Sequence, residues 1–212
     1  MNKLGVVIPY YRTSTIREAL FKELVNLLKL QLKDREDIEV CITEDGSTSK
    51  WLEDDYLILQ SFNITYFRLK ENRGISYARN EGIDYLLFKN CNYIIFIDSD
   101  DFIDFDYFDK IMNEIKVNPR QYYFTDFDIL GNILPRKGLQ NRVTGIIFHK
   151  DLLKDARFNE EYRCAEDVEF NDRCMRDKLI EPYYIDTVYH YNYGIDKKCL
   201  SYVGGDHNVE KE

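Results

Sequence analysis

Residues 93–101, with the sequence YIIFIDSDD, contain the pattern that decides the fold of this chain. Residues 93–97 are all apolar or aromatic, and residues 98–101 place three aspartates directly after them. An apolar run without polar alternation is typical of a strand that is buried on both faces, as in a parallel sheet. Because ligands of parallel sheets bind beyond the carboxyl ends of the strands, we predict that the aspartates face a binding crevice.

The segments before this strand repeat an alternation of strand and helix. Apolar runs predict strands at residues 5–8, 38–43 and 64–69. Helical spacing of apolar residues predicts helices at residues 15–33, 51–61 and 76–89. Alternating units over about 100 residues predict an α/β fold, in which a parallel sheet is covered by helices on both faces.

The second half of the chain is less regular. Helical spacing recurs at residues 107–117, 150–156 and 166–178. Strand patterns lie at residues 121–133, with a turn at Gly131-Asn132, and at residues 145–148 and 183–191. No repeat or Pro/Gly-rich linker divides the chain, so we predict a single domain, 1–212, with lobes at residues 1–101 and 102–212.

The composition is that of a globular protein with a sizeable core. The 212 residues are 44% hydrophobic and 32% charged. No apolar run approaches the roughly 20 residues of a membrane span. The N-terminus lacks a signal-peptide pattern, and the five cysteines are dispersed without a Cys-x-x-Cys pair. These features predict a cytoplasmic protein with reduced thiols and no transmembrane segment, and they leave peripheral membrane association open.

The net charge of −9 argues against long nucleic acid as a partner. Affinity for nucleic acid comes mainly from Lys and Arg side chains that displace counterions. The one local concentration of basic residues is Arg136, Lys137, Arg142 and Lys150. A nucleic-acid target is therefore disfavoured but left open, and the acidic excess is equally consistent with a divalent-metal site.

Polar side chains are predicted to gather at one edge of the parallel sheet. The predicted strands are followed by Pro9-Tyr10-Tyr11-Arg12, by Glu44-Asp45 and by Asp98-Ser99-Asp100-Asp101, and Arg73 and Arg79 flank the loop after the third strand. Carboxylate oxygens bind hard divalent cations, and guanidinium groups bind phosphate. The combination suits a crevice that holds a divalent metal and a diphosphate.

Asp98 and Asp100 are the strongest candidates for metal ligands. Alternate residues of an extended segment point to the same side, so both carboxylates can face a ligand, with Asp101 beside them. Two crowded carboxylates repel each other unless a cation neutralises them. The same segment is also typical of a turn or a helix N-cap before residues 107–117, so the pattern leaves both interpretations open.

A second acidic pair, Glu166-Asp167, begins the predicted helix of residues 166–178. The positive end of the helix dipole favours acidic residues at such a position. The pair would also suit a carboxylate base on the opposite side of the crevice from the metal. Spacing alone does not decide between these two roles.

Several enzyme classes lack their sequence signatures in this chain. The three histidines, His149, His190 and His207, show no metal-ligand spacing, which argues against a zinc hydrolase. Pro9 and aromatic residues follow the first strand, where phosphate-binding and dinucleotide-binding loops carry glycines. The lack of glycine in residues 9–14 also argues against a nucleotidyltransferase, and no Gly-x-Ser-x-Gly motif indicates a serine hydrolase.

Taken in order, the motifs of this chain resemble those of the family 2 glycosyltransferases of GT-A fold. The matching segments are Val7-Ile8-Pro9-Tyr10-Tyr11, Glu44-Asp45-Gly46-Ser47-Thr48, residues 72–80 (NRGISYARN), residues 96–101 (FIDSDD), residues 145–148 (GIIF) and Glu166-Asp167. The common order of these motifs makes the resemblance specific over most of the chain. It implies a Rossmann-like, mostly parallel sheet flanked by helices. It also implies that residues 1–101 bind a nucleotide sugar and that residues 102–212 bind the acceptor and carry the catalytic base.

The resemblance further implies a role for each matching residue. The donor-binding residues would be Pro9, Tyr10, Glu44, Asp45, Arg73, Arg79 and Asp98. The ligands of Mn²⁺ or Mg²⁺ would be Asp100, Asp98 and Asp101, and Asp167 would be the general base, supported by Glu166. The implied reaction moves a sugar, with inversion, from a nucleotide-diphosphate sugar to a hydroxyl group. A UDP-sugar is the expected donor, and a glycan, glycolipid or other cellular molecule is the expected acceptor.

Departures from the family pattern leave alternatives open. Glu44 replaces the first acid of the usual Asp-Asp pair, Asn192 follows Tyr191 where an arginine is frequent, and Ser201-Tyr202-Val203 replaces a Ser-x-Ser. A basic contact to the diphosphate would then be missing or come from Lys197 or Lys198. The alternatives are a catalytically weak module that binds a sugar nucleotide or glycan, and a transferase that acts on modified nucleic acid.

Overall fold

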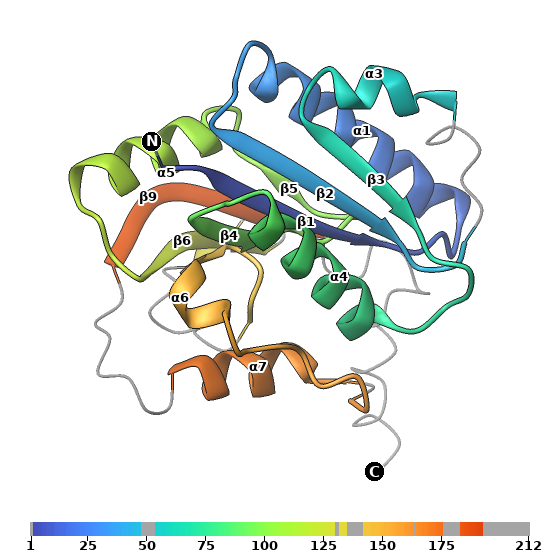
Figure 1. The fold of residues 1–212 in the computed structure, drawn as a ribbon. Helices are drawn as coiled ribbons and strands as arrows, with labels where there is room; N and C mark the ends of the chain where they lie inside the picture. The colour runs from blue at the N-terminus through green and yellow to red at the C-terminus, as the bar shows by residue number, and fades with distance from the viewer. Residues whose placement is uncertain are drawn as a thin grey trace.

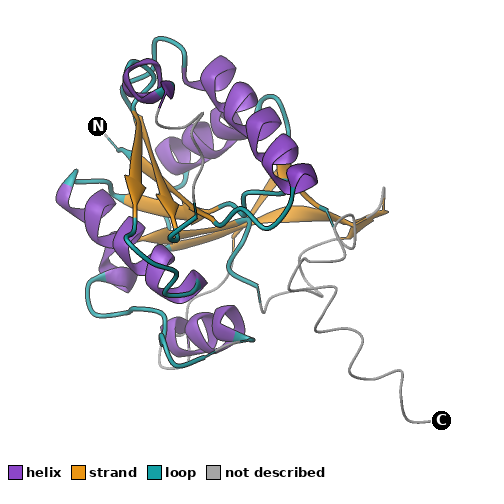
Figure 2. Ribbon diagram, turned by 90° about the vertical axis from the view of Figure 1, so that its right-hand side faces the viewer, coloured by secondary structure: helices purple, strands orange, loops and turns teal. Residues whose placement is uncertain are grey.

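The structure is a computed structural model that describes residues 2–47, 54–129, 132–134, 142–162, 164–175 and 183–192. In these residues nine strands form one sheet, in the order β3-β2-β1-β4-β8-β6-β9-β5, with β7 paired to β6. Helices cover both faces of the sheet (Figures 1 and 2). The predicted α/β class is therefore confirmed.

The first half of the chain builds the parallel part of the sheet. Its strands are β1 (Leu4–Tyr10), β2 (Ile38–Glu44), β3 (Ile64–Arg68) and β4 (Tyr93–Phe96). β1 pairs in parallel with β2 and β4, and β2 pairs in parallel with β3. The helices between them are α1 (Thr15–Leu32), α3 (Tyr56–Gln60) and α4 (Ile75–Phe88). Parallel pairing brings the carboxyl ends of these strands, and the loops after them, to one edge of the sheet.

The second half extends the same sheet with strands of both directions. Its elements are β5 (Phe102–Ile103), α5 (Tyr107–Val117), β6 (Tyr122–Ile129), β7 (Asn132–Leu134), β8 (Ile146–His149), α6 (Lys150–Leu153), α7 (Glu166–Met175) and β9 (Tyr183–Tyr191). β8 is antiparallel to β4 and β6, whereas β9 is parallel to β6 and antiparallel to β5. The two halves of the chain therefore share one continuous sheet.

The predicted boundaries differ from the structure mainly in the second half. The strand pattern at residues 121–133 contains two strands, β6 and β7, and the helix predicted at residues 150–156 ends at Leu153. The sequence does not predict β5, because two residues are too few to show a period and only pairing with β9 defines the strand. Gly131, and parts of the helices predicted at residues 51–61 and 166–178, lie outside the described residues.

Each face of the sheet has its own apolar core. Leu4, Val6 and Ile8 of β1 belong to the core beneath α1 and α5, whereas Val7 belongs to the core beneath α4, α6 and α7 (Figure 1). β1 and β2 are buried along their whole length, which explains why their sequences do not alternate between apolar and polar residues. Full burial of one aliphatic side chain stabilises the fold by about 1.5–3 kcal/mol, so this central part of the sheet is the most strongly fixed.

The described cysteines and helices agree with the sequence analysis. Cys41, Cys91, Cys164 and Cys174 are free thiols, as predicted. Burial raises the pKa of Cys41 and of Cys91 to about 12, so both thiols stay protonated at neutral pH. Within the described ranges, no helix is long and apolar enough to cross a membrane.

Helix α4 packs against β1 without room for a side chain at Gly82. A Cβ atom there would lie 2.6 Å from Cγ1 of Val7. We expect Gly82→Ala to lower the free energy of unfolding by about 1–2 kcal/mol in urea titrations, because overpacking outweighs the better helix propensity of alanine. Val7→Ala makes room for the new methyl group, so the double variant should lose less than the sum of the two single variants. Additive losses would contradict this packing.

Candidate functional site

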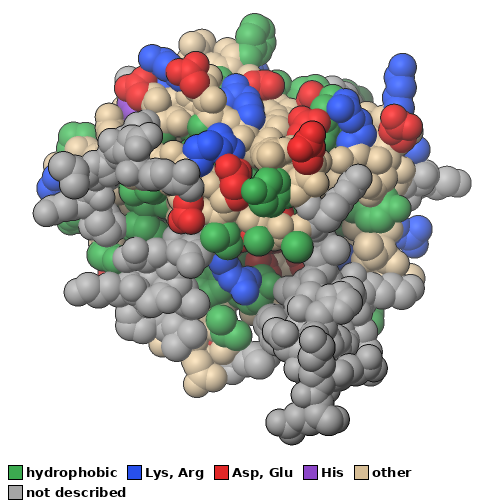
Figure 3. Space-filling view, turned by 90° about the horizontal axis from the view of Figure 1, so that it is seen from below, with side chains coloured by type: hydrophobic (Ala, Val, Ile, Leu, Met, Phe, Trp, Pro, Cys, Tyr) green, Lys and Arg blue, Asp and Glu red, His purple; other side chains and the backbone are tan. Residues whose placement is uncertain are grey.

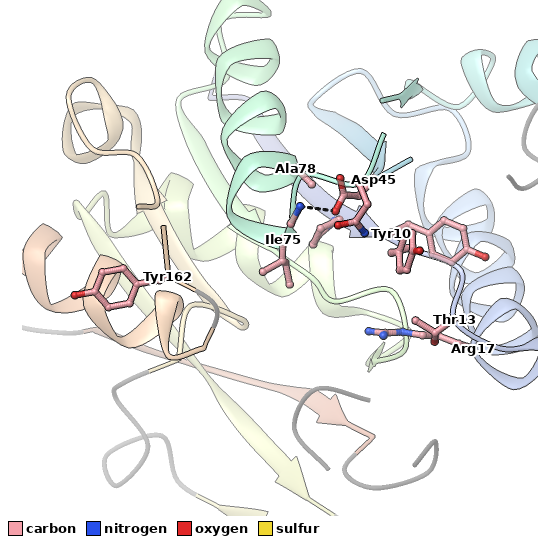
Figure 4. Close-up of a pocket in the computed structure, with 11 residues that line it drawn as sticks. Tyr10, Thr13, Arg17, Asp45, Ile75, Ala78 and Tyr162 are labelled. Atoms are coloured by element: carbon pink, nitrogen blue, oxygen red, sulfur yellow. Dashed lines mark hydrogen bonds between the residues drawn. The ribbon is translucent and has the colours of Figure 1, made fainter. Parts of the chain in front are cut away.

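A cavity of about 310 Å³ opens beyond the carboxyl ends of β1 and β2. Pro9 and Tyr10 reach it from the end of β1, and Asp45 reaches it from the loop after β2 (Figure 4). Other lining residues include Tyr11, Thr13, Arg17, Asn72, Ile75 and Tyr162. A volume of this size falls in the range of small-ligand sites. Three of the residues predicted to bind the donor therefore share one cavity.

Asp45 connects the end of β2 to the start of α4. Its Oδ1 accepts a hydrogen bond from the Arg73 backbone N–H at 2.7 Å, and its Oδ2 accepts one from the Gly74 N–H at 2.8 Å. Gly46 permits this approach, because a Cβ atom there would lie 2.2 Å from the carbonyl carbon of Glu71 and because its φ of +71° disfavours other residues. Asp45 thus lines the cavity in an orientation that backbone contacts fix.

Glu44 and the Arg73 side chain do not line this cavity. Glu44 is fully buried, and its carboxylate accepts hydrogen bonds from the hydroxyls of Ser47, at 2.7 Å, and Tyr66. The Arg73 side chain is 46% exposed, and its guanidinium carbon lies 3.4 Å from the ring centroid of Tyr77. Both residues support the loops around the cavity, and their predicted contacts with the donor stay predictions.

Arg79 is a buried cation at the centre of the predicted site. Its side chain, 2% exposed, extends from α4, with one terminal nitrogen 2.9 Å from Oδ1 of Asp98 and the other 2.9 Å from Oε1 of Glu166. Burial works against the charge, but Asp98, Glu166 and Asp167 together keep the pKa of Arg79 above its ordinary value. The carboxylates after β4 and those at the start of α7 therefore lie around one guanidinium. The predicted contact of Arg79 with a diphosphate stays a prediction.

Asp98 lies close enough to Asp100 to affect its charge. Asp100 is 7% exposed, and its Oδ1 lies 3.2 Å from a terminal nitrogen of Arg17. Burial raises the pKa of Asp100, Arg17 opposes the rise, and Asp98 adds to it. Asp100 is thus a buried carboxylate with one arginine partner and one acidic neighbour, a setting in which a bound cation would offset the repulsion from Asp98.

Asp101 is held by β9 and the residue that follows it. Its two carboxylate oxygens accept hydrogen bonds from the Tyr189 hydroxyl, at 2.6 Å, and from the Asn192 backbone N–H, at 2.9 Å. The Tyr189 hydroxyl also accepts the Asp98 N–H at 3.0 Å, and the Asn192 amide donates to the Asp100 carbonyl. Burial, with Asp100 and Asp98 nearby, raises the pKa of Asp101 well above its ordinary value. These bonds fix the backbone of the aspartate loop, residues 98–101.

Glu166 and Asp167 begin α7, as predicted. Glu166 pairs with Arg79, and Oδ1 of Asp167 accepts the Val168 backbone N–H at 2.9 Å. Burial raises the pKa of Asp167, Arg79 opposes the rise, and Glu166 adds to it. A carboxylate with a raised pKa accepts a proton more readily, so Asp167 combines a helix-start position with the surroundings expected of a general base.

Two carboxylates of the aspartate loop fit a divalent metal that binds together with a diphosphate. Among the residues that the structure describes, no group of three or more His, Cys, Asp or Glu side chains is arranged to hold a metal ion. Asp101 is 1% exposed and both of its oxygens accept hydrogen bonds, so Asp98 and Asp100 are the better placed candidate ligands, and the predicted role of Asp101 stays a prediction. Mg²⁺ sites commonly use one or two carboxylates and complete their shell with substrate phosphates and water.

The sequence analysis missed Arg17 and Tyr189. Arg17 lies in the first turn of α1, where Ser14 is the N-cap residue. The helix dipole disfavours a cation in the first turn of a helix. An arginine at this position is therefore a sequence signal that could have identified Arg17 as a candidate site residue. Tyr189 lies in a tyrosine-rich strand, and nothing in the sequence relates its hydroxyl to Asp101, 88 residues earlier.

The site therefore combines a cavity at a sheet edge, which Asp45 and Arg17 line, with the carboxylates around Arg79, which do not line the cavity. The face shown in Figure 3 is hollowed, with acidic, basic and hydrophobic side chains interspersed around the hollow. The sequence matches the family model Glycosyl transferase family 2 over residues 5–171. The chain therefore belongs to this family, and the resemblance drawn from its motifs is confirmed. A comparison with curated proteins gives no match.

Solved structures of glycosyltransferases share the fold. S. aureus TarS 1-349 in complex with UDP superposes with a TM-score of 0.75 and 21% identity, over 89% of this chain and 60% of that chain. The same fragment in complex with UDP-GlcNAc gives a TM-score of 0.73 at 21% identity, over 89% of this chain and 58% of that chain. The mannosyltransferase PcManGT from Pyrobaculum calidifontis, in complex with GDP-Man and Mn²⁺, gives a TM-score of 0.66 at 15% identity. The match covers 89% of this chain and 56% of that chain.

These superpositions establish a common GT-A-type fold. The chain spans about 60% of the length of the TarS fragment that it matches.

Replacing Arg79 removes the charge that Asp98, Glu166 and Asp167 share. We expect Arg79→Met to lower the free energy of unfolding by about 2–4 kcal/mol at pH 7, because it leaves buried carboxylates without their counter-charge. The loss of unfolding free energy should be smaller at pH 5. Without Arg79 the pKa of Asp167 rises further, so at pH 5 the folded variant binds a proton there more readily than the unfolded chain does, and this proton uptake stabilises the fold. Chemical denaturation at both pH values measures the two effects.

Arg12→Met is the matched control for Arg79→Met. Arg12 pairs with Glu18, and its side chain is 42% exposed. We expect its loss to stay within about 1 kcal/mol and to be similar at both pH values, as for other exposed ion pairs. Equal effects of the two substitutions, or an Arg79→Met loss that does not change with pH, would contradict the central position of Arg79.

Proposed function

We propose that this glycosyltransferase transfers a sugar from a nucleoside-diphosphate sugar to a hydroxyl group, with inversion at the anomeric carbon. The observation that supports this most is the meeting of two sets of carboxylates at Arg79: Asp98 after β4, and Glu166 with Asp167 on α7. Asp98 suits the diphosphate end of a donor, and Glu166 with Asp167 suits the acceptor hydroxyl. Such a placement lets both reactants meet at one point.

The cavity is the proposed site of the nucleoside. Pro9 and Tyr10 form the wall of the cavity at the end of β1, and the adjacent Tyr11, 41% exposed, offers aromatic surface for the base. Asp45 offers carboxylate oxygens to N–H or O–H groups of the base or ribose. A UDP-sugar is our first choice of donor, because the matched TarS structures include complexes with UDP and UDP-GlcNAc. A GDP-sugar is the second choice, because the matched mannosyltransferase is in complex with GDP-Man.

Asp98 and Asp100 are the proposed ligands of Mn²⁺ or Mg²⁺. When bound, the metal supplies positive charge that stabilises the leaving diphosphate. Mn²⁺ in the matched mannosyltransferase structure supports the choice of metal. Asp101 is proposed to assist by fixing the loop through Tyr189 and β9, and not as a direct ligand.

Asp167 is the proposed general base, and Arg79 with Glu166 sets its charge environment. Its carboxylate takes the proton of the acceptor hydroxyl while the hydroxyl oxygen forms a bond to the anomeric carbon. The bond between that carbon and the diphosphate oxygen breaks in the same step, and the nucleoside diphosphate leaves with the electron pair. A base of this kind contributes about 10²–10⁴-fold to the rate.

The acceptor is proposed to be a glycan, a glycolipid or another cellular molecule with a free hydroxyl. Tyr162, which is 44% exposed, lies across the cavity from Tyr10 in Figure 4 and offers an aromatic face on which a sugar ring can stack. Of the basic residues that a nucleic-acid acceptor would use, Arg136 and Lys137 lie outside the described residues. Nothing in the described residues favours that acceptor over a sugar.

Asp167→Asn tests the proposed base. We expect the substitution to reduce transfer or donor hydrolysis by about 10²–10⁴-fold and to leave the affinity for UDP or GDP within about threefold of wild type. Glu169→Gln, in the first turn of the same helix, is the matched control and should keep most of the activity. Unaltered turnover by Asp167→Asn would remove Asp167 from this role.

The pH profile gives a second readout for Asp167. Because its pKa is raised, the wild-type rate should fall with decreasing pH at a higher pH than for an ordinary aspartate, whose pKa is 3.8. Initial rates between pH 4 and pH 8 measure this limb. Donor binding without transfer or hydrolysis over a broad acceptor panel would instead support the binding-module alternative.

A further inference from the structure

Arg17 lies between the cavity and the aspartate loop. It belongs to the first turn of α1, where its backbone N–H donates to the Ser14 hydroxyl at 3.2 Å. Its side chain lines the cavity, is 15% exposed, and places a terminal nitrogen 3.2 Å from Oδ1 of Asp100. Figure 4 shows it extending from α1 toward the middle of the cavity. One guanidinium therefore faces both the proposed nucleotide site and a proposed metal ligand.

The position of Arg17 is electrostatically costly unless an anion offsets it. The first turn of a helix carries the positive end of the dipole, which disfavours an arginine there. Asp100 is the anion that the structure supplies, and it is itself buried beside Asp98. A planar guanidinium also matches the oxygens of a phosphate group, with several N–H donors in one plane. The Arg17 guanidinium is thus suited to exchange its partner, the Asp100 carboxylate, for the diphosphate of a donor.

We propose that Arg17 binds the diphosphate of the donor and that, in the donor-free protein, it competes with a divalent cation for the carboxylate of Asp100. This inference rests on the proposed function. A donor in the cavity draws Arg17 toward its phosphates and leaves the Asp100 oxygen to the cation. Cation and nucleotide therefore bind cooperatively, and the cation alone binds weakly.

The test compares Arg17→Met with wild type in two binding measurements that need no turnover. Mn²⁺ alone is titrated and followed by electron paramagnetic resonance, and UDP and GDP are titrated by calorimetry in EDTA. We expect Arg17→Met to bind Mn²⁺ at least about threefold more tightly, because the guanidinium that competes with Mn²⁺ for Asp100 is gone. The variant should bind the preferred nucleotide about tenfold more weakly or worse, because a charge-assisted contact to the diphosphate is lost.

Two further variants separate this role from loss of fold or of net charge. Lys22→Met removes one positive charge from the same helix at a position that is 46% exposed, and both affinities should stay at wild-type values. Arg17→Lys keeps the charge but not the planar fork, and its nucleotide affinity should lie between wild type and Arg17→Met. Melting temperatures measured in parallel confirm that each variant is folded.

The outcomes distinguish this inference from the proposed function. If wild type binds neither nucleotide, in EDTA or with Mn²⁺ present, the proposed function and this inference both fail. If wild type binds a nucleotide and Arg17→Met binds it equally well, only the inference fails. Unchanged or weaker Mn²⁺ binding by Arg17→Met would also overturn the inference, because it would show no competition at Asp100.

Discussion

The buried ion pairs of Arg79 are the constraint on which the rest of the site depends. A guanidinium that is 2% exposed must have partners, because an isolated buried charge costs several kcal/mol. Its partners, Asp98 and Glu166, come from a loop after a central strand and from a helix of the second half. Folding therefore brings the two sets of carboxylates together as a condition of burying Arg79, and the same contact sets the spacing between the proposed donor and acceptor sites.

The sheet supplies the second constraint. β9 pairs with β5 and β6, so Tyr189 and Asn192 reach the aspartate loop from the strands added by the second half. The loop consequently has fixed backbone contacts although its side chains repel one another. Such repulsion is relieved by a ligand of opposite charge, and here a divalent metal ion is the proposed ligand.

The parallel half of the fold could be predicted from sequence because its signals are local. Largely apolar runs mark β1, β2 and β4, and the residues at and after their carboxyl ends, including Pro9 and Asp45, fall at the sheet edge for topological reasons. β5 could not be predicted, because its two residues become a strand only through pairing with β9. The motif of Arg79 predicts its position at the site, but the contact of Arg79 with Glu166 depends on α7, which lies 87 residues further along the chain.

The most direct test of this account is a crystal structure of the protein with Mn²⁺ and the nucleotide, UDP or GDP, that it binds more tightly. We predict the base beside Pro9 and Tyr10 and the diphosphate next to Asp98 and Asp100. Arg79 should keep its contacts with Asp98 and Glu166, because the site is organised around them. A nucleotide bound outside this cavity, or an Arg79 side chain that leaves both carboxylates to contact the diphosphate, would contradict the account.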